Sequence, residues 1–150
     1  MIAVLDGTYV TQLRTGAASG AAFDVLARKD ARIGALIGTG GQAATQLEAM
    51  LAARDIKEVR VFDLNYDRTK EFADRMQEEL ASYGAKIVAA KTSDEAVEGA
   101  DLLITVTPSS KPVFDASKVK EGATISWCRR IPAAYAGDGS RNPDPRIQDL

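Results

Sequence analysis

The stretch that decides the fold is Leu36-Ile37-Gly38-Thr39-Gly40-Gly41-Gln42-Ala43, which lies between an apolar run at residues 33–37 and a helix-like run at 44–53. This order of strand, glycine turn and helix is typical of a dinucleotide-binding unit. Gly38 allows the tight turn, Gly40 removes a side chain where a pyrophosphate approaches the backbone, and Ala43 lets the helix pack closely on the strand. The N-terminus of that helix then faces the anionic phosphates.

An acidic residue follows the next apolar run at the distance that such a unit needs. The run is residues 59–62, and Asp63 comes about 20 residues after the turn. A carboxylate in this place accepts hydrogen bonds from both ribose hydroxyls and repels a 2′-phosphate. Asp63 therefore predicts NAD as the cofactor in preference to NADP, although the nearby Arg68 is able to reach a 2′-phosphate. The alternative role for Asp63 is an ordinary helix-capping or turn aspartate.

The rest of the chain up to residue 126 alternates strands and helices. Strands are expected at 86–90, 101–107 and 123–126, and helices at 67–83 and 93–97, with Gly84 ending the first helix and Ser93 capping the second. This alternation predicts an α/β fold, a Rossmann-like doubly wound parallel sheet. Because ligands bind beyond the carboxyl ends of such strands, the loops after Ile37, Phe62 and Val106 are expected around one site.

The residues before the glycine turn are expected to form a short strand-helix segment. Residues 3–5 are expected to form a strand, Asp6-Gly7 a turn, and residues 11–26 a helix. Small residues at Gly16, Ser19 and Gly20 predict a helix face that another backbone or a ligand approaches closely. Tight helix packing alone is the alternative explanation.

The composition is that of a globular protein with one core. The chain has 150 residues, of which 45% are hydrophobic and 27% charged, and its net charge is −2. There is no basic excess for nucleic acid, no apolar run long enough to cross a membrane, and no signal peptide. The single cysteine, Cys128, fits a reducing compartment and predicts a cytoplasmic protein. The absence of histidine excludes histidine-based triads and most catalytic zinc sites, and no metal site is predicted.

The chain is expected to divide into three sections. Residues 1–30 form the strand and linking helix, 31–126 the dinucleotide-binding domain, and 127–150 an irregular tail. The tail begins abruptly with Trp-Cys-Arg-Arg and continues at 136–145 with many glycine, aspartate and proline residues and no apolar period. This pattern is typical of a linker or a disordered segment.

Several of these motifs together resemble the ornithine cyclodeaminase/mu-crystallin family. They are Asp-Gly-Thr at 6–8, Leu-Arg-Thr-Gly-Ala-Ala-Ser at 13–19, the glycine turn at 38–43, and the segments 96–107 and 119–126. The resemblance covers residues 3–126. It implies a nicotinamide-dependent enzyme of amino-acid or imino-acid metabolism, such as an ornithine cyclodeaminase, alanine dehydrogenase or ketimine reductase. It also implies a homo-oligomer, because the substrate domain of the family is its dimerisation unit.

The resemblance assigns roles to matching positions. Arg14 falls on the arginine that contacts the substrate carboxylate and the cofactor, and a guanidinium grips a carboxylate bidentately. Thr107 falls on the threonine beside the nicotinamide. The phosphate-binding turn corresponds to Gly38, Thr39, Gly40, Gly41 and Gln42. The alternatives are a solvated salt bridge for Arg14 and an ordinary strand end for Thr107, and no residue is assigned a catalytic role.

The sequence departs from the family in three places. The first half of the substrate domain and its C-terminal segment are not present in this sequence. The glycine-rich loop that carries the acid/base aspartate of the cyclodeaminases is replaced by Trp-Cys-Arg-Arg-Ile at 127–131. A gene read one base later across residues 131–146 can encode a family-like continuation, so the tail is either frameshifted or genuinely divergent, and sequencing the gene decides.

Two functions follow from these observations. The first is a truncated NAD-binding domain of an amino-acid or imino-acid oxidoreductase with little activity alone, whose substrate the sequence does not identify. The second is a non-catalytic nucleotide-binding or subunit-interaction protein of the same fold. Without a covering domain, apolar residues in the first section are expected to be partly exposed and to drive self-association through residues 1–26. These residues are Leu5, Val10, Leu13, Ala17 and Phe23.

Overall fold

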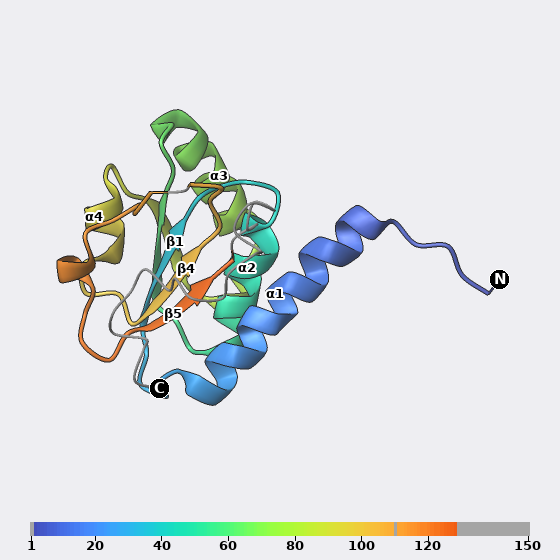
Figure 1. The fold of residues 1–150 in the computed structure, drawn as a ribbon, viewed down its shortest axis with the longest axis horizontal. Helices are drawn as coiled ribbons and strands as arrows, with labels where there is room; N and C mark the ends of the chain where they lie inside the picture. The colour runs from blue at the N-terminus through green and yellow to red at the C-terminus, as the bar shows by residue number, and fades with distance from the viewer. Residues whose placement is uncertain (1, 110, 129–150) are drawn as a thin grey trace, which may run out of the picture.

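The structure is a computed structural model of the chain that describes residues 2–109 and 111–128. The described residues form a five-stranded sheet in the order β3-β2-β1-β4-β5 (Figure 1). Every neighbouring pair is parallel. The strands are β1 (Ile33–Ile37), β2 (Glu58–Phe62), β3 (Lys86–Ala89), β4 (Leu102–Thr105) and β5 (Thr124–Trp127). This arrangement confirms the predicted α/β, Rossmann-like fold.

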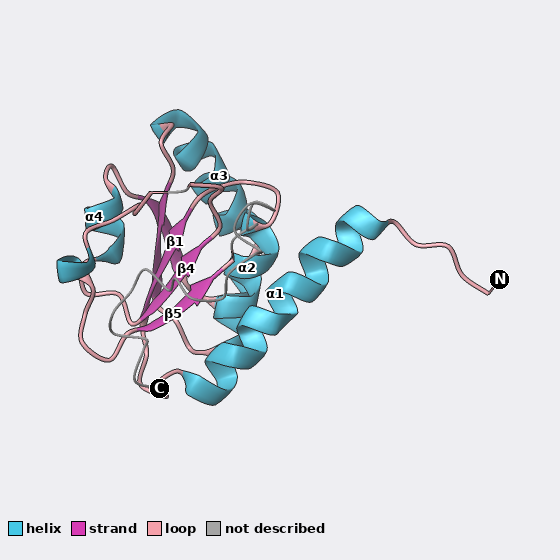
Figure 2. Cartoon of the chain, in the orientation of Figure 1, coloured by secondary structure: helices cyan, strands magenta, loops and turns pink. Residues whose placement is uncertain are grey.

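Helices cover both faces of the sheet, as Figure 2 shows. Helices α2 (Ala43–Ala53) and α3 (Tyr66–Glu79) pack on one face, α1 (Gly7–Leu26) lies against α2, and the short α4 (Ser93–Val97) covers the other face. The central strand β1 and its neighbour β4 are apolar and almost completely buried, as parallel strands with helices on both faces must be. Two 3₁₀ turns, Ala81–Tyr83 and Ala116–Lys118, complete the described elements.

Glycine residues set the distance between α1 and α2. A methyl group on Gly16 would lie 2.6 Å from the carbonyl oxygen of Thr45, and one on Gly20 would lie 3.3 Å from Ala49. On the neighbouring side of α1, the hydroxyl of Ser19 hydrogen-bonds to that of Ser126 in β5 at 2.9 Å. The predicted close approach of another backbone is therefore confirmed at Gly16, where that backbone belongs to α2 of the same chain.

The N-terminal section differs from the expectation in two ways. Residues 2–6 form no strand, and α1 begins at Gly7 because the side chain of Asp6 accepts a hydrogen bond from the backbone N–H of Thr8 at 2.9 Å. A strand needs an edge to pair with, and this end of α1 projects away from the sheet (Figure 1). The expected exposure of Phe23 is also wrong, because its side chain is completely buried in the main core.

Three element boundaries differ as well. Helix α3 ends at Glu79, so Tyr83 lies in the following 3₁₀ turn and is exposed, while Gly84 ends that turn with φ +70°. The cap of α4 is Thr92, whose hydroxyl accepts from the backbone N–H of Glu95, and Ser93 is the first helical residue. Trp127 belongs to β5 instead of the tail. Residues 129–150, which carry the frameshift hypothesis, lie outside the described part.

None of the helices in the described part of the chain combines the length and the apolarity that crossing a bilayer requires.

Candidate functional site

The carboxyl ends of four strands meet at one edge of the sheet. Ile37 of β1 pairs with both Phe62 of β2 and Thr105 of β4, and Thr105 pairs with Trp127 of β5. The residues that follow these strands therefore leave the sheet side by side. Ligands of doubly wound sheets bind at this edge, so the loops expected around one site do lie together.

Gly38 brings the glycine turn against the loop that follows β4. Its φ is +103°, a conformation that residues with side chains rarely adopt. A methyl group here would lie 2.9 Å from the carbonyl oxygen of Val106 and 3.0 Å from a methyl carbon of Thr107. Both the backbone conformation and the close contact therefore require glycine, and the turn packs directly against the loop.

Gly40 has a different explanation, because nothing in the protein requires a glycine there. Its φ is not positive, and a methyl group on it would meet no atom within 4 Å. The missing side chain leaves open space in front of α2 that a Cβ would begin to fill. A pyrophosphate that approaches the backbone needs this space, so the turn fits the group that the sequence predicts.

The N-terminus of α2 has no side-chain cap. Its N-cap residue, Gln42, makes no capping hydrogen bond, whereas Asp6, Asn65 and Thr92 cap the other three described α-helices. Uncapped N–H groups and the positive end of the helix dipole attract anions. Ala43, the first residue of α2, is completely buried, so the helix lies close to the sheet as its small side chain predicts.

Asp63 is held directly beside the glycine turn. Its Oδ2 accepts hydrogen bonds from the backbone N–H and from the hydroxyl of Thr39, each at 2.8 Å. The guanidinium of Arg68 donates to the carbonyl oxygen of Thr39 at 3.0 Å. Burial opposes ionisation of Asp63, but the hydrogen bonds from Thr39, with the charge of Arg68 and the N–H of Leu64, outweigh it and lower the pKa of the carboxyl group. Asp63 is therefore a carboxylate at neutral pH.

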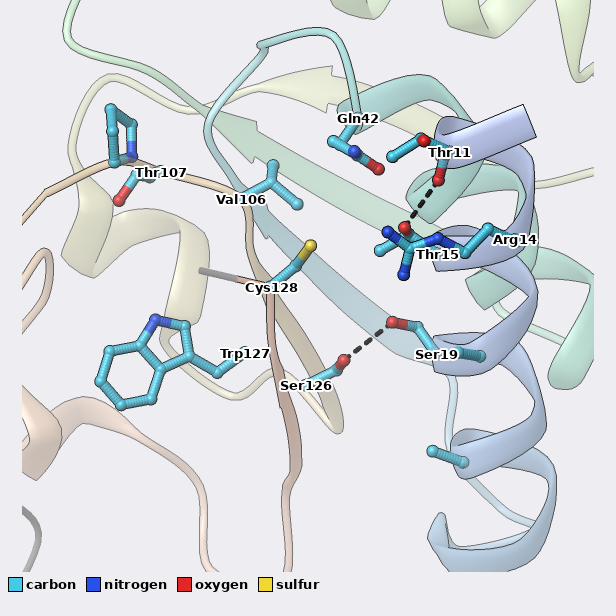
Figure 3. Close-up of a pocket in the computed structure, with 13 residues that line it drawn as sticks. Thr11, Arg14, Thr15, Ser19, Gln42, Val106, Thr107, Ser126, Trp127 and Cys128 are labelled. Carbon is cyan, nitrogen blue, oxygen red and sulfur yellow. Dashed lines mark hydrogen bonds between the residues drawn. The ribbon is translucent and has the colours of Figure 1, made fainter. Parts of the chain in front are cut away.

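A cleft of about 840 Å³ lies beside the turn, between α1 and the ends of β4 and β5. One face of α1, Gln42, the loop at Val106, Thr107 and Pro108, and the end of β5 line it. Figure 3 shows the Arg14 guanidinium directed from α1 toward Cys128. The cleft thus brings together three of the residues that the sequence assigns to a site: Arg14, Gln42 and Thr107.

The end of β5 contributes a thiol to this cleft. The backbone N–H of Cys128 continues the β4–β5 ladder by donating to the carbonyl oxygen of Thr105 at 2.9 Å. Partial burial raises the pKa of the Cys128 thiol, and the positive charge of Arg14 opposes this only in part. The thiol is therefore neutral at pH 7, and it is no activated nucleophile.

Several lining residues escaped the sequence reasoning. Thr11, Thr15, Ala18 and Ala22 share the face of α1 that carries Arg14, at the spacing of three or four residues that a helix face requires. That spacing is visible in the sequence, and it could have indicated that these residues share a face with Arg14. No signal pointed to Ser126, Trp127 and Cys128, because only the register of β5 against β4 brings them to the cleft.

In the described part of the chain, no three histidine, cysteine, aspartate or glutamate side chains gather closely enough to hold a metal ion.

Comparison with known proteins gives one matching family and several close relatives. The sequence model of the ornithine cyclodeaminase/mu-crystallin family matches residues 1–137. The alanine dehydrogenase of Archaeoglobus fulgidus is 41% identical over 125 residues, which are 83% of this chain and 37% of that protein. A Δ1-pyrroline-2-carboxylate reductase of Bacillus cereus is 38% identical with the same coverage. The chain thus spans little more than a third of the length of these relatives.

Solved structures of the same two kinds of enzyme also superpose on the chain. The Δ1-pyrroline-2-carboxylate reductase of Thermococcus litoralis, in complex with NADH and L-proline, superposes with a TM-score of 0.77 at 40% identity. The match covers 82% of this chain and 37% of the reductase. An archaeal alanine dehydrogenase dimer with bound NAD superposes with a TM-score of 0.69 at 40% identity, covering 80% of this chain and 36% of that one.

Proposed function

Because the chain belongs to the ornithine cyclodeaminase/mu-crystallin family, we propose that it is the NAD-binding portion of an oxidoreductase that acts on an amino acid or imino acid. The observation that carries the proposal is the position of Asp63, whose carboxylate is bonded to Thr39 of the glycine turn at 2.8 Å. The acid for the ribose and the turn for the pyrophosphate are thereby adjacent, as one dinucleotide requires.

The proposed roles follow the geometry of the strand ends. The turn at Gly40 and the uncapped N-terminus of α2 bind the pyrophosphate, and Asp63 accepts hydrogen bonds from the adenosine ribose. The nicotinamide end then extends toward the cleft, where Thr107 and Gln42 line the wall. The bound cofactor supplies hydride transfer.

Arg14 is proposed to grip the carboxylate of the substrate. It is the one arginine that lines the cleft in the described residues, and the guanidinium is directed toward its interior (Figure 3). A guanidinium binds a carboxylate through two parallel hydrogen bonds, which fixes both position and orientation. Relatives act on, or bind, small amino or imino acids such as alanine, pyrroline-2-carboxylate and proline, which all carry this carboxylate.

The test is a titration with NADH of a variant in which a side chain at Gly40 fills the proposed pyrophosphate space. The Cβ of a valine at Gly40 would meet no protein atom within 4 Å, so we expect Gly40→Val to keep the fold while its side chain fills the pyrophosphate space. Gly7→Val is the matched control, because Gly7 is equally open and lies at the far end of α1. NADH fluorescence should report binding by the unmodified chain and by the Gly7 variant, with a loss of at least about tenfold in the Gly40 variant. Equal affinity in all three proteins contradicts the proposed site.

A second candidate, a subunit-interaction protein of the same fold, is favoured by the apolar residues that the projecting end of α1 exposes. Tyr9 and Leu13 are 59% and 52% exposed, and Val4 and Leu5 precede them with still higher exposure. Exposed apolar groups in such a cluster mark interaction surfaces. The same titration separates the two candidates, because an interaction protein without cofactor binding gives no response to NADH or NADPH.

A further inference from the structure

We propose that Thr39 is a positioning residue that determines cofactor selectivity, because it holds the Asp63 carboxylate in the place where that carboxylate meets the ribose. The inference rests on the proposed function and deepens it, since it concerns the same dinucleotide site. Thr39 lies in the glycine turn, where the sequence pattern alone gives its side chain no role.

The first support is the number and direction of the bonds between the two residues. The backbone N–H and the hydroxyl of Thr39 both donate to Oδ2 of Asp63, each at 2.8 Å. Two donors from one residue fix the orientation of a carboxylate more tightly than one donor does. Because both bonds from Thr39 use Oδ2, they leave Oδ1 unoccupied by Thr39, and the carboxylate has acceptor capacity for a ligand beyond what the N–H of Leu64 uses.

The second support is burial. Thr39 is 8% exposed, whereas Asp63 is only partly buried and Arg68 is exposed. A buried hydroxyl is ordered by its surroundings, so it offers a rigid anchor to a carboxylate that solvent reaches. A preorganised acceptor loses less entropy when the ribose arrives.

The third support is the competing cation. Arg68 donates to the carbonyl oxygen of Thr39 at 3.0 Å and lies close enough to lower the pKa of Asp63 by its charge. A carboxylate released from the Thr39 hydroxyl would be drawn toward this guanidinium. Asp63 would then meet the ribose less well and repel a 2′-phosphate less strongly, so the hydroxyl of Thr39 favours NADH over NADPH.

The experiment measures NADH and NADPH dissociation constants on the full chain and on two variants of one position. Thr39→Val removes the hydroxyl and keeps the shape, while Thr39→Ser keeps the hydroxyl. The valine variant should bind NADH about fivefold to tenfold more weakly and NADPH within about twofold of the unmodified chain. The expected loss is smaller than that of a direct hydrogen bond to a charged group, because the hydroxyl acts on the cofactor only through Asp63. The serine variant should retain the NADH preference to within about twofold.

The ratio of the NADH and NADPH affinities distinguishes a positioning role of Thr39 from a general structural role. A distorted glycine turn would weaken both cofactors equally, because both carry the same pyrophosphate. In an Asp63→Ala background, Thr39→Val should cause no further loss of NADH affinity, since the two residues act as one unit. An equal loss for both cofactors, or the same loss without Asp63, overturns the inference.

A second readout needs no cofactor. Carbon NMR of the Asp63 carboxyl group should show a higher pKa in the valine variant than in the unmodified chain and in the serine variant. If the unmodified chain binds neither cofactor, the proposed function fails, and this titration still decides whether Thr39 holds Asp63. If NADH binds and both variants retain its affinity and the carboxyl pKa, only the role of Thr39 is wrong. If the valine variant does not fold, Thr39→Ala takes its place in both measurements.

Discussion

The Oδ2 atom of Asp63 and the backbone nitrogen of Thr39 lie 2.8 Å apart, which joins the acid at the end of β2 to the glycine turn after β1. The turn and the acid that the sequence assigns to one dinucleotide are thus bonded to each other within the protein. The proposed site therefore needs little rearrangement on binding, because the proposed ribose acceptor and the proposed phosphate-binding turn are already held next to each other.

Asp101 should stabilise the fold through its bonds to β1. Its Oδ2 accepts from the backbone N–H groups of Arg32 and Ile33 at 2.8 and 3.1 Å, and its Oδ1 accepts from Lys120 at 2.5 Å. Asp101→Asn should lower the free energy of unfolding by about 1–3 kcal/mol, because the amide replaces an acceptor by a donor facing donors. Urea unfolding at pH 7 measures this, with the exposed Glu71→Gln as a control expected to stay within about 0.5 kcal/mol.

The contribution of Asp101 to the free energy of unfolding should also depend on pH. Burial opposes its ionisation, but the bonds from Arg32, Lys120 and Ile33 outweigh it, so the pKa is lower than the ordinary 3.8. A carboxyl group with a lower pKa in the folded state contributes its full stability above the unfolded pKa and loses it as the pH falls through the folded pKa. The difference between the unmodified chain and Asp101→Asn should therefore be constant from pH 7 to about 5 and shrink below about 4. A difference that grows on acidification contradicts this assignment.

The packing contact between α1 and α2 should tolerate no side chain at Gly16. A methyl group there would lie 2.6 Å from the carbonyl oxygen of Thr45, so Gly16→Ala forces the helices apart and should destabilise the chain by about 1–3 kcal/mol. Gly7→Ala meets no neighbour and should be neutral or slightly stabilising. Thermal unfolding compares the melting temperatures of the two variants. Equal melting temperatures would show that α1 and α2 are not tightly packed at Gly16.

Turnover by this chain alone should be near background. Hydride transfer needs a substrate held against the nicotinamide, and Arg14 is the one substrate-holding residue that the resemblance assigns to this sequence. The absorbance of NADH should therefore stay constant with pyruvate and ammonia, or with a cyclic imine. Reduction of either substrate by the purified chain would mean that the cleft holds it without further residues.

Self-association through residues 1–26 should occur, although with a smaller surface than the sequence suggests. Phe23 is buried, and Gly16 and Gly20 already lie against α2. Four of the five predicted apolar residues are nevertheless exposed: Leu5, Val10, Leu13 and Ala17. Leu13→Gln removes apolar area at a surface position and should shift the chain toward monomer in sedimentation experiments. If the unmodified chain is already a monomer at concentrations on the order of tens of micromolar, the prediction is wrong.

Local sequence signals were sufficient for the sheet and for the glycine turn. Apolar runs bounded by turn residues predicted the five strands that the structure contains. The spacing from Gly38 to Asp63 predicted that the turn and the acid lie together, which their hydrogen bond confirms, while their binding of a cofactor stays a prediction. The strand and turn preferences act over a few residues, and the second signal needs only the distance along the sequence between two such segments.

The cleft was only partly predictable, because it depends on long-range packing. Arg14 and Thr107 were found by resemblance, but the contribution of Trp127 and Cys128 depends on how β5 pairs with β4. The missing strand at the N-terminus has the same cause, since an apolar run becomes a strand only where a sheet edge is available. The cap at Asp6 was misassigned because an aspartate-glycine pair also begins turns.

Calorimetric titration of the full chain with NADH and with NADPH tests the central claim most directly. The account predicts that NADH binds with one site per chain and more tightly than NADPH, because Asp63 accepts from the ribose hydroxyls and repels a 2′-phosphate. Absence of binding by both cofactors, or tighter binding of NADPH than of NADH, would contradict it.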